Sequence, residues 1–549
     1  LIGDVGFTIG GGGNVRFGRF QDPRAALRAR IQHKVVVPPD AGLSARKPIP
    51  ASTGGQVQKQ GRSYEELKAK HLAAGTLFED DEFPAIGSSI FYSQPTAGLF
   101  QWKRPKELSA SPKFISDGIS RFDVEQGELG DCWLLAAVAN LSLYQDLLDQ
   151  VVPHDQSFDH EYCGIFRFHF WHFGEWVEVV IDDRLPTRNN RLVFLHSHDQ
   201  DEYWSALLEK AYAKLFGSYE ALKGGSTVEA LEDFTGGLAE FYDLRGKQPP
   251  DFDKIINHCY AKKSLMACSI NADPNVVEAR QSNGLIRGHA YSITKIVNQP
   301  TGKVMLIRIR NPWGNEAEWN GRWSDRSREW QSVSDQTRRD LGLTFDADGE
   351  FWMCFDDFVR EYEKLEICHL GPQSLNDTAG SARITFQMTV EHGTWQPGVN
   401  AGGCRNFLET FWTNPQYRVQ VQDADDNDNE DKGTLIIGLM QKNRRKMRKQ
   451  GIDLLTIGFM VYAVKHSGPL DMNFFKYNAA VARSNAFINS REVSGRFRLT
   501  PGTYVIVPST FQKNEQADFV LRIFSEKIST SEYELLVSKV DGEGRNDYL

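Results

Sequence analysis

The 549-residue sequence predicts an α+β region over about residues 76–370, followed by an all-β sandwich over residues 371–528. The first region is dense in Trp and Phe and mixes the 3.6-residue period of buried helices with the alternation of strands. The second consists of short β-branched or aromatic runs separated by turn residues, without a convincing helix. At roughly 150 residues per domain, the chain has room for about three or four domains.

The composition excludes several classes of protein. Hydrophobic residues make up 40% and charged residues 25%, which excludes wholesale disorder, and the net charge of −9 at pH 7 gives no reason to expect nucleic-acid binding. Seven scattered cysteines without a CxxC pair favour neither a disulfide framework nor a structural zinc site. The apolar runs are too short to span a bilayer, and no secretory leader opens the sequence. We therefore expect a cytoplasmic location and leave open whether either end is complete.

The elements follow in order along the chain. Residues 1–75 are predicted to be a flexible Gly/Pro-rich region that ends in a short helix from about residue 63. Apolar residues at helical spacing predict buried helices at Cys132–Tyr144 and Tyr203–Phe216. Alternation predicts a strand pair at Gly164–Ile181 and a strand at Val304–Ile309.

The all-β region begins after a Gly-rich linker at Gly371–Gly380. Its seven predicted strands are Arg383–Val390, Gln416–Gln422, Thr434–Leu439, Thr456–Val464, Gly495–Leu499, Tyr504–Pro508 and Phe519–Phe524. Seven short strands separated by turns are typical of a β-sandwich. Residues 529–549 are predicted to be a short C-terminal tail.

Cys132 stands where glycines and Asp131 end and a buried helix begins. A thiol at a helix N-terminus lies near unpaired N–H groups and the positive end of the helix dipole, and both stabilise the nucleophilic thiolate. A cysteine at such a place is, however, often only a packed small residue.

Two further motifs lie downstream of this cysteine. His289 opens an apolar stretch within Gly288–Ser292, and Asn311 precedes Pro312 at the end of the strand predicted at Val304–Ile309. Taken singly, the histidine reads as structural and the Asn-Pro pair as a turn. In order, Cys, His and Asn match the nucleophile, general base and orienting amide of a papain-like thiol protease.

These blocks resemble the three catalytic blocks of the calpain family. The similarity includes the segments Gln126–Ala137, Glu202–Tyr212, Glu232–Gly237, Gly288–Tyr291, Arg310–Gly314 and Gly349–Met353, and it extends from about Ile90 to Ser525. It implies a papain-like core of two subdomains, 76–226 and 227–370, followed by a C2-like sandwich. The implied activity is calcium-activated limited proteolysis of intracellular proteins through a thioester acyl-enzyme.

The resemblance also implies roles for individual residues. Cys132 is the nucleophile, His289 the base, and Asn311 holds the imidazole in position. Trp313 shields that contact from water. Gln126 forms the oxyanion hole together with the backbone N–H of Cys132.

Two calcium ions are implied in the core, where hard oxygen ligands are needed. The first site would take the carboxylates of Asp123 and Glu202 and carbonyls near Ser116 and Gly118. The second would take the carboxylates of Glu318, Asp325, Asp348 and Glu350 and a carbonyl near Asp346. Relative to the common spacing of the family, one extra residue stands at Asn315–Ala317, next to Glu318. Without the resemblance, all these acids read as solvated surface charges. Calcium would close a hinge near Lys223–Val228, so we expect the calcium-free enzyme to be misaligned.

The sandwich carries an acidic loop between Asp423 and Asp431 and a basic cluster between Lys442 and Lys449. The loop lacks the glycine and glutamate of an EF-hand. The basic residues near Arg444–Lys449 suggest binding of acidic phospholipid, with a solvated exposed loop as the alternative. No EF-hand pattern follows, which indicates an atypical short form or an incomplete chain, and a heterodimer with a small subunit is not expected.

Two other classes of function stay open. A catalytically idle scaffold would act through the sandwich, although Cys132, His289, Asn311 and Gln126 are all present. Transglutaminase chemistry also uses a Cys/His pair, although the block Asn311–Trp313 favours proteolysis. An assay that compares casein cleavage with amine incorporation distinguishes proteolysis from transglutaminase chemistry.

Overall fold

The computed structural model describes residues 58–59, 63–94, 98–116, 118–273, 276, 278–298, 304–315, 317–343, 346, 348–371, 387–423, 431–465, 467–525 and 532–534. All of them belong to one compact unit, Ala51–Leu549. Most of the predicted N-terminal region, the linker after Gly371 and most of the acidic loop lie outside the described residues, so those predictions stay untested. None of the described helices combines the length and the apolar character needed to cross a bilayer.

The first lobe is built around α5 (Cys132–Leu141), every residue of which is buried. Beside it lie α7 (Trp204–Phe216), α8 (Thr227–Thr235) and the hairpin of β3 (Ile165–His172) and β4 (Glu175–Asp182). The predicted helices and strand pair of this part are therefore confirmed. Its smaller elements are β1 (Gln58–Lys59), α2 (Tyr64–Ala74), α3 (Gly87–Ile90), β2 (Gln101–Lys103), α4 (Pro105–Leu108), η1 (Arg121–Asp123), α6 (Gln145–Val151), β5 (Leu185–Arg188), β6 (Arg191–Leu192) and η2 (Glu220–Leu222).

The second lobe is a six-stranded antiparallel sheet in the order β11-β10-β9-β8-β12-β7. Its strands are β7 (Leu238–Asp243), β8 (Leu265–Ile270), β9 (His289–Asn298), β10 (Met305–Arg310), β11 (Glu350–Cys354) and β12 (Lys364–His369). Its helices are α9 (Phe252–Ala261), η3 (Arg328–Ser332), α10 (Asp335–Leu341) and α11 (Phe355–Glu361). The strand predicted at Val304–Ile309 corresponds to β10.

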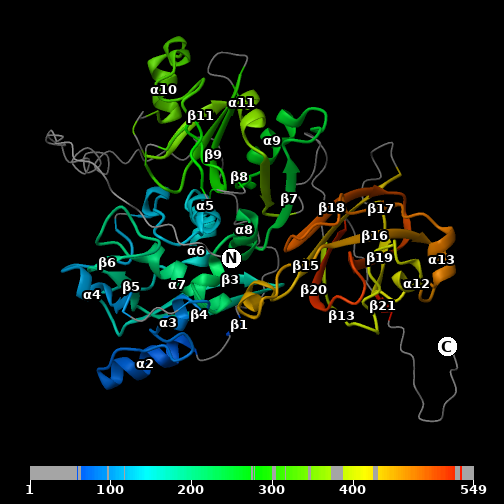
Figure 1. The fold of residues 1–549 in the computed structure, drawn as a ribbon, viewed down its shortest axis with the longest axis horizontal. Coiled ribbons are helices and arrows are strands. Elements are labelled where there is room, and N and C mark those ends of the chain that lie inside the picture. The colour runs from blue at the N-terminus through cyan, green and yellow to red at the C-terminus, as the bar shows by residue number, and fades with distance from the viewer. Residues whose placement is uncertain are drawn as a thin grey trace. The chain divides into compact units, whose positions relative to one another are not determined.

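Helix α5 lies against this sheet (Figure 1). Ser292 in β9 donates a hydrogen bond to the carbonyl of Ala136, at 2.9 Å. Asn140 donates to the carbonyl of Met266 in β8, also at 2.9 Å. These buried bonds fix the helix that begins with Cys132 next to the strand that begins with His289, because buried polar groups need partners.

Gly236 and Gly237 connect α8 to β7. The predicted boundary at residue 226 falls directly before α8, whose apolar residues pack in a core shared with α5 and with Ala239 and Cys368 of the sheet. Gly236 has a φ of 69°, and a Cβ on Gly237 would lie 2.5 Å from the sulfur of Cys368. Glycine is therefore required at this connection, both for the left-handed turn and for the close packing on β12.

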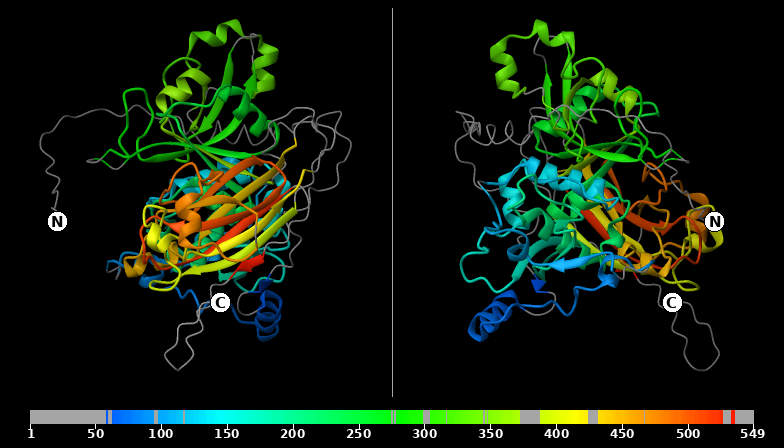
Figure 2. Two further views of the ribbon diagram at one scale, coloured as in Figure 1. Left: turned by 90° about the vertical axis from the view of Figure 1, so that its right-hand side faces the viewer. Right: turned by 60° about the vertical axis from the view of Figure 1, so that its left-hand side comes forward.

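The third part is a sandwich of two antiparallel sheets, and its strands face the viewer in the left view of Figure 2. One sheet contains β13 (Gln387–Trp395), β20 (Ala517–Ser525), β15 (Gly433–Gln441) and β18 (Glu492–Leu499). The other contains β17 (Ala482–Arg483), β16 (Ile457–Val464), β19 (Gly502–Thr510), β14 (Gln416–Val421) and β21 (Glu532–Glu534). Both sheets contribute to one buried core, as the apolar patterns of their strands require.

All seven strands predicted for this part have a counterpart, although residues 383–386 of the first one lie outside the described residues. Two more strands, β17 and β21, were not predicted, and β21 pairs with β14 from within the segment expected to be a tail. The expectation that this part lacks helices was wrong in detail. Short helices occur at α12 (Leu408–Phe411), η5 (Arg445–Gln450) and α13 (Met472–Tyr477).

The sandwich is joined to α8 of the first lobe through buried ion pairs. Arg491 contacts Glu232 at 2.5 Å and Asp233 at 2.8 Å. Arg522 pairs with Glu492 and donates to the carbonyls of Gly236 and Gly237. Buried guanidinium groups need such partners because unpaired buried charges are costly.

Candidate active site

Cys132 is the first residue of α5, and its side chain is 9% exposed. Asp131 precedes it in a non-helical conformation, so the helix begins at the cysteine itself. The thiol therefore lies at the positive end of the helix dipole, as the sequence predicted.

His289 and Asn311 come from adjacent strands. His289 opens β9, and Asn311 follows the last residue of β10, which pairs with Ser292 of β9. Nε2 of His289 lies 2.7 Å from Oδ1 of Asn311. Both side chains are buried. The strand register thus places the predicted imidazole and amide in contact.

The amide of Asn311 is fixed in one orientation. Its Nδ2 donates to the carbonyl of Ala317 at 2.9 Å, and its Oδ1 accepts from the backbone N–H of Trp313 at 3.0 Å. Oδ1 can therefore only accept from His289, so Nε2 of that ring carries a proton. The other ring nitrogen, Nδ1, is left to face the reactive groups.

Cys132 lies close to that imidazole. The sulfur of Cys132, a ring nitrogen of His289 and a carboxylate oxygen of Glu278 all lie within 4.8 Å of one another. Burial opposes a charge on His289, yet hydrogen bonds to Cys132, Glu278 and Asn311 raise the pKa of His289 to about 9. This arrangement stabilises a thiolate–imidazolium pair.

Glu278 was missed by the sequence analysis. Its Oε1 lies 3.3 Å from Nδ1 of His289, and its side chain is 26% exposed. No motif or periodicity surrounds it, so no signal in the sequence could have identified it. The residue has a φ of 54°, which is unusual for a residue other than glycine.

Gln126 and Trp313 lie beside this group. The backbone N–H of Gln126 donates to the carbonyl of Pro312 at 3.2 Å, and its Nε2 donates to that of Leu129 at 3.0 Å. The indole of Trp313 lies 4.9 Å from the ring of His289, measured between ring centroids. The five residues predicted around the reaction centre are therefore together.

The acids predicted for the first calcium site are also close together. Glu202 accepts hydrogen bonds from the backbone N–H of Ser116 and the hydroxyl of Ser197, both at 2.7 Å. Burial, and then the nearby carboxylate of Asp123, raise the pKa of Glu202 to about 8. Gly118 lies in the same segment with a φ of 90°. Two carboxylates that repel each other in a buried place suit a divalent cation.

The acids predicted for the second site come from the loop before β11 and from the segment that follows Trp313. Burial, and then Asp325 and Asp348, raise the pKa of Glu318 to about 8. Burial, and then Asp348 and Glu350, raise the pKa of Asp325 to about 7. The carbonyl of Asp346 accepts from the backbone N–H of Asp348 at 2.9 Å. This oxygen-rich, acidic group likewise fits calcium in its chemistry.

One ion pair connects the two sets of acids across the lobes. Arg121, in η1 two residues before Asp123, donates to both carboxylate oxygens of Glu350, at 2.6 and 2.8 Å. Burial opposes the charge on Glu350, but Arg308 and Arg121 lower its pKa to about 2. Glu350 is thus already partnered by cations, unlike Glu318 and Asp325, whose pKa values are raised.

Comparison with known families gives two matches. Residues 78–369 match the family described as "Calpain family cysteine protease", and residues 391–524 match "Calpain large subunit, domain III". The second match covers most of the sandwich.

Individual relatives agree with these matches. The chain is 54% identical over 474 residues to Calpain-B of Drosophila melanogaster, covering 84% of this chain and 51% of that protein. It is 53% identical over 480 residues to Calpain clp-1 of Caenorhabditis elegans, covering 86% and 61%. It is 51% identical over 485 residues to Calpain-9 of Rattus norvegicus, covering 88% and 69%. The chain thus spans about half to two thirds of the length of these relatives.

Proposed function

Because the chain belongs to the calpain family of cysteine proteases, we propose that it is a calcium-activated cysteine endopeptidase that cleaves intracellular proteins at a limited number of sites. The observation that carries this proposal is the grouping of Cys132, His289 and Asn311 at the junction of the two lobes. We also propose that the two lobes form a papain-like core and that the sandwich is a C2-like domain. All seven cysteines are free, which supports a cytoplasmic location.

The proposed reaction is acyl transfer to sulfur. The thiolate of Cys132 attacks the scissile carbonyl carbon, and the electrons of the C=O bond move to oxygen. The Nε2–H of Gln126 and the backbone N–H of Cys132 stabilise that oxyanion. As the C–N bond breaks, His289 gives its Nδ1 proton to the leaving amine, and a thioester remains.

The second half of the reaction regenerates the enzyme. His289, now neutral, takes a proton from a water molecule that attacks the thioester carbon. The C–S bond breaks, the carboxylic acid product leaves, and Cys132 and His289 again share one proton. Asn311 keeps Nε2 protonated throughout, so Nδ1 always faces the sulfur.

Two calcium ions are part of the proposal. Asp123 and Glu202, with carbonyls near Ser116 and Gly118, would hold one. Glu318, Asp325, Asp348 and Glu350, with the carbonyl near Asp346, would hold the other. When bound, each ion supplies positive charge that relieves repulsion among these carboxylates and so favours the aligned arrangement of the lobes.

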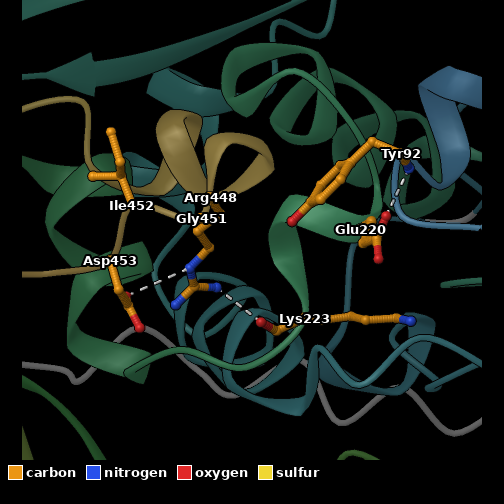
Figure 3. A pocket seen from close by; sticks show the side chains of 7 residues that line it. All are labelled: Tyr92, Glu220, Lys223, Arg448, Gly451, Ile452 and Asp453. Carbon is orange, nitrogen blue, oxygen red and sulfur yellow. Dashed lines mark hydrogen bonds and ion pairs between the residues drawn. The ribbon is translucent and has the colours of Figure 1, made fainter.

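Acidic phospholipid stays a proposed partner, but several arginines of the basic cluster already contact other parts of the chain, so fewer basic residues are free to bind it. Arg445 forms an ion pair with Glu229, and Arg444 donates to the carbonyl of Asp453. Arg448 donates to the carbonyls of Lys223 and Gly224. Arg448 lines a cavity of about 340 Å³ beside Tyr92 and Glu220 (Figure 3).

Lys446 and Lys449 are the exposed members of the basic cluster. We therefore assign the lipid contact to them, since a headgroup needs accessible charge. Sedimentation with phosphatidylserine vesicles should fall in a Lys446→Gln/Lys449→Gln variant and not in Lys476→Gln, a change of another lysine of the sandwich. Unchanged sedimentation of the double variant would remove this partner.

Casein digestion tests the main proposal. Wild type should cleave casein with calcium, lose activity when EGTA removes it, and recover when calcium is restored. Cys132→Ser should be inactive under every condition. Amine incorporation without cleavage would indicate transglutaminase chemistry, and neither activity in a folded protein would indicate an idle scaffold. Full cleavage in EGTA would remove the calcium switch while keeping the protease.

A further inference from the structure

Three different metal-binding atoms lie close together at the side chains of Cys132, His289 and Glu278. Their sulfur, ring nitrogen and carboxylate oxygen lie within 4.8 Å of one another, a grouping of metal-binding atoms that stands out among the described residues. His289 and Cys132 are buried, whereas Glu278 is 26% exposed. The third ligand therefore lies on the side from which an ion in solution can enter.

The contact with Asn311 leaves Nδ1 as the ring nitrogen that a metal can bind. Nε2 of His289 is protonated because it donates to Oδ1 of Asn311, at 2.7 Å, and that amide is held by Trp313 and Ala317. The lone pair of the neutral ring is then on Nδ1, the atom 3.3 Å from Oε1 of Glu278. Metal-binding histidines are commonly oriented in this way, by a second-shell carbonyl or carboxylate on the other nitrogen.

The spacing suits a small tetrahedral ion. With Zn–N and Zn–O bonds of about 2.0–2.1 Å, neighbouring ligand atoms of a tetrahedron lie about 3.3 Å apart. The separation between Nδ1 of His289 and Oε1 of Glu278 is 3.3 Å. The sulfur, on a bond of about 2.3 Å, needs to lie about 3.6 Å from each of them. All three ligand atoms already lie within 4.8 Å of one another, so a small rotation of the side chains completes the site.

We propose that Cys132, His289 and Glu278 form a zinc site that blocks the reaction centre. A thiolate, an imidazole and a carboxylate are a ligand set typical of Zn²⁺, with a fourth position open to water. Calcium, which prefers six to eight oxygen ligands, does not suit it. Zinc would therefore oppose the ion that activates the enzyme, at a different place in the chain.

Binding of zinc to Cys132 and His289 releases one proton. Whether written as thiol and imidazole or as thiolate and imidazolium, Cys132 and His289 hold one proton between them at their facing atoms. Zinc bonds to the sulfur and to Nδ1 and displaces that proton to solvent. The nucleophile and the base are then both occupied, so neither attack nor proton transfer is possible.

Glu278 is the residue that distinguishes this site from a bare Cys/His pair. A neutral amide in its place keeps the size of the side chain but loses the charge and most of the affinity for a divalent ion. Since the side chain is partly exposed, Glu278→Gln leaves the buried core unchanged. The matched control is Asp253→Asn, which neutralises an exposed acid of α9 in the same lobe.

The primary experiment measures metal binding directly and needs no turnover. Co²⁺ is titrated into the full chain at saturating calcium, and the thiolate-to-cobalt charge-transfer absorption is followed and then displaced by Zn²⁺. We expect the band to be absent in Cys132→Ser. We expect the zinc affinity from this competition to fall at least about tenfold in Glu278→Gln and to stay within about twofold in Asp253→Asn.

A second measurement uses casein cleavage at the same fixed calcium concentration. The zinc concentration that halves each variant's own rate should rise by the same factor in Glu278→Gln. A band that persists in Cys132→Ser, or a zinc affinity of Glu278→Gln equal to that of wild type, would overturn the site. Because absorption reports binding without catalysis, a chain that binds zinc yet cleaves nothing would reject the proposed protease function and keep this inference.

Discussion

Oδ1 of Asn311 lies 2.7 Å from Nε2 of His289 and at the same time accepts the backbone N–H of Trp313 at 3.0 Å. The two contacts use both acceptor positions of one oxygen. The ring is thereby held with Nδ1 toward Cys132, so a single amide decides which nitrogen can take part in proton transfer.

The first prediction concerns this amide. Asn311→Ala removes the acceptor of the Nε2 proton, so the ring can rotate and present the wrong tautomer to Cys132. We expect kcat for casein to fall by about 10²-fold, the lower end of what positioned acid–base groups contribute, with KM nearly unchanged. A KM effect without a kcat effect would contradict the orienting role.

Gln126 allows a separate test of the oxyanion hole. Its Nε2 makes one hydrogen bond, to the carbonyl of Leu129, which leaves its second N–H to donate to substrate. Gln126→Ala should lower kcat by about 10²–10³-fold, as does loss of one oxyanion donor elsewhere. Gln336→Ala, in an exposed position of α10, is the control and should leave kcat unchanged. Equal rates for both variants would exclude Gln126 from the chemistry.

The sequence was sufficient to predict the helices and strands that have a local apolar pattern. It was also sufficient to predict that Cys132 stands at the start of a helix. Helix α5, all of whose residues are buried, and the seven predicted strands of the sandwich carry apolar residues in patterns that are visible within the sequence of each element itself. By contrast, β21 has no such pattern and exists because β14 offers it an open edge.

The parts of the site that local sequence patterns could not predict depend on contacts between distant segments. Cys132, His289 and Asn311 could be joined into one centre only through the family resemblance, since no spacing rule connects them. Glu278 lacked even that signal. Its place beside His289 follows from the turn before β9, in which the backbone N–H of Arg287 donates to the carbonyl of Ala279 and Arg280 pairs with Ile286.

Arg121 and Glu350 give a prediction about calcium. Their two hydrogen bonds, at 2.6 and 2.8 Å, connect the two lobes next to both predicted ion sites. Arg121→Ala leaves Glu350 without its partner from the first lobe, so binding at one site should no longer assist the other. We expect the calcium concentration for half-maximal casein cleavage to rise at least about fivefold.

The control for that experiment is another arginine of the first lobe. Arg188 pairs with Glu128 at 2.7 Å, but both side chains are largely exposed, so Arg188→Ala should change little. If the calcium titrations of wild type and Arg121→Ala superimpose, the ion pair does not couple the two sites.

His172 at the end of β3 makes stability depend on pH. Burial, and then the charges of Arg491, Lys446 and Lys442, lower its pKa from 6.5 to about 3. The folded chain therefore keeps this ring neutral, whereas the unfolded chain protonates it below about pH 6.5. Its contribution to stability is complete above that pH, falls as the pH drops, and stops changing only near pH 3.

The measurement is urea unfolding at several pH values between 7.5 and 5. Below about pH 6, the wild type should lose stability relative to His172→Phe by about 1.4 kcal/mol per pH unit. Phe keeps the ring contact with Phe173, whose centroid lies 4.1 Å away. His160→Phe changes an exposed histidine and should follow the wild-type curve. Parallel curves for wild type and His172→Phe would show that His172 titrates normally.

Arg445 provides the last prediction, which separates structural from surface roles within the basic cluster. Its guanidinium forms two hydrogen bonds with Glu229 of α8, at 2.8 and 2.6 Å, and lies 4.3 Å from the ring centroid of Trp133, the residue after the nucleophile. Arg445→Met leaves Glu229 as a buried, unpaired charge, so we expect a loss of about 3–5 kcal/mol in the free energy of unfolding.

Lys446, next in sequence and exposed, is the matched control, and Lys446→Met should change stability by less than about 0.5 kcal/mol. Urea denaturation of the full chain measures both. Because Trp133 contacts Arg445, loss of the sandwich contact should also shift the tryptophan emission of Arg445→Met under native conditions. Equal stability of the two variants would mean that the ion pair to Glu229 does not hold the sandwich against α8.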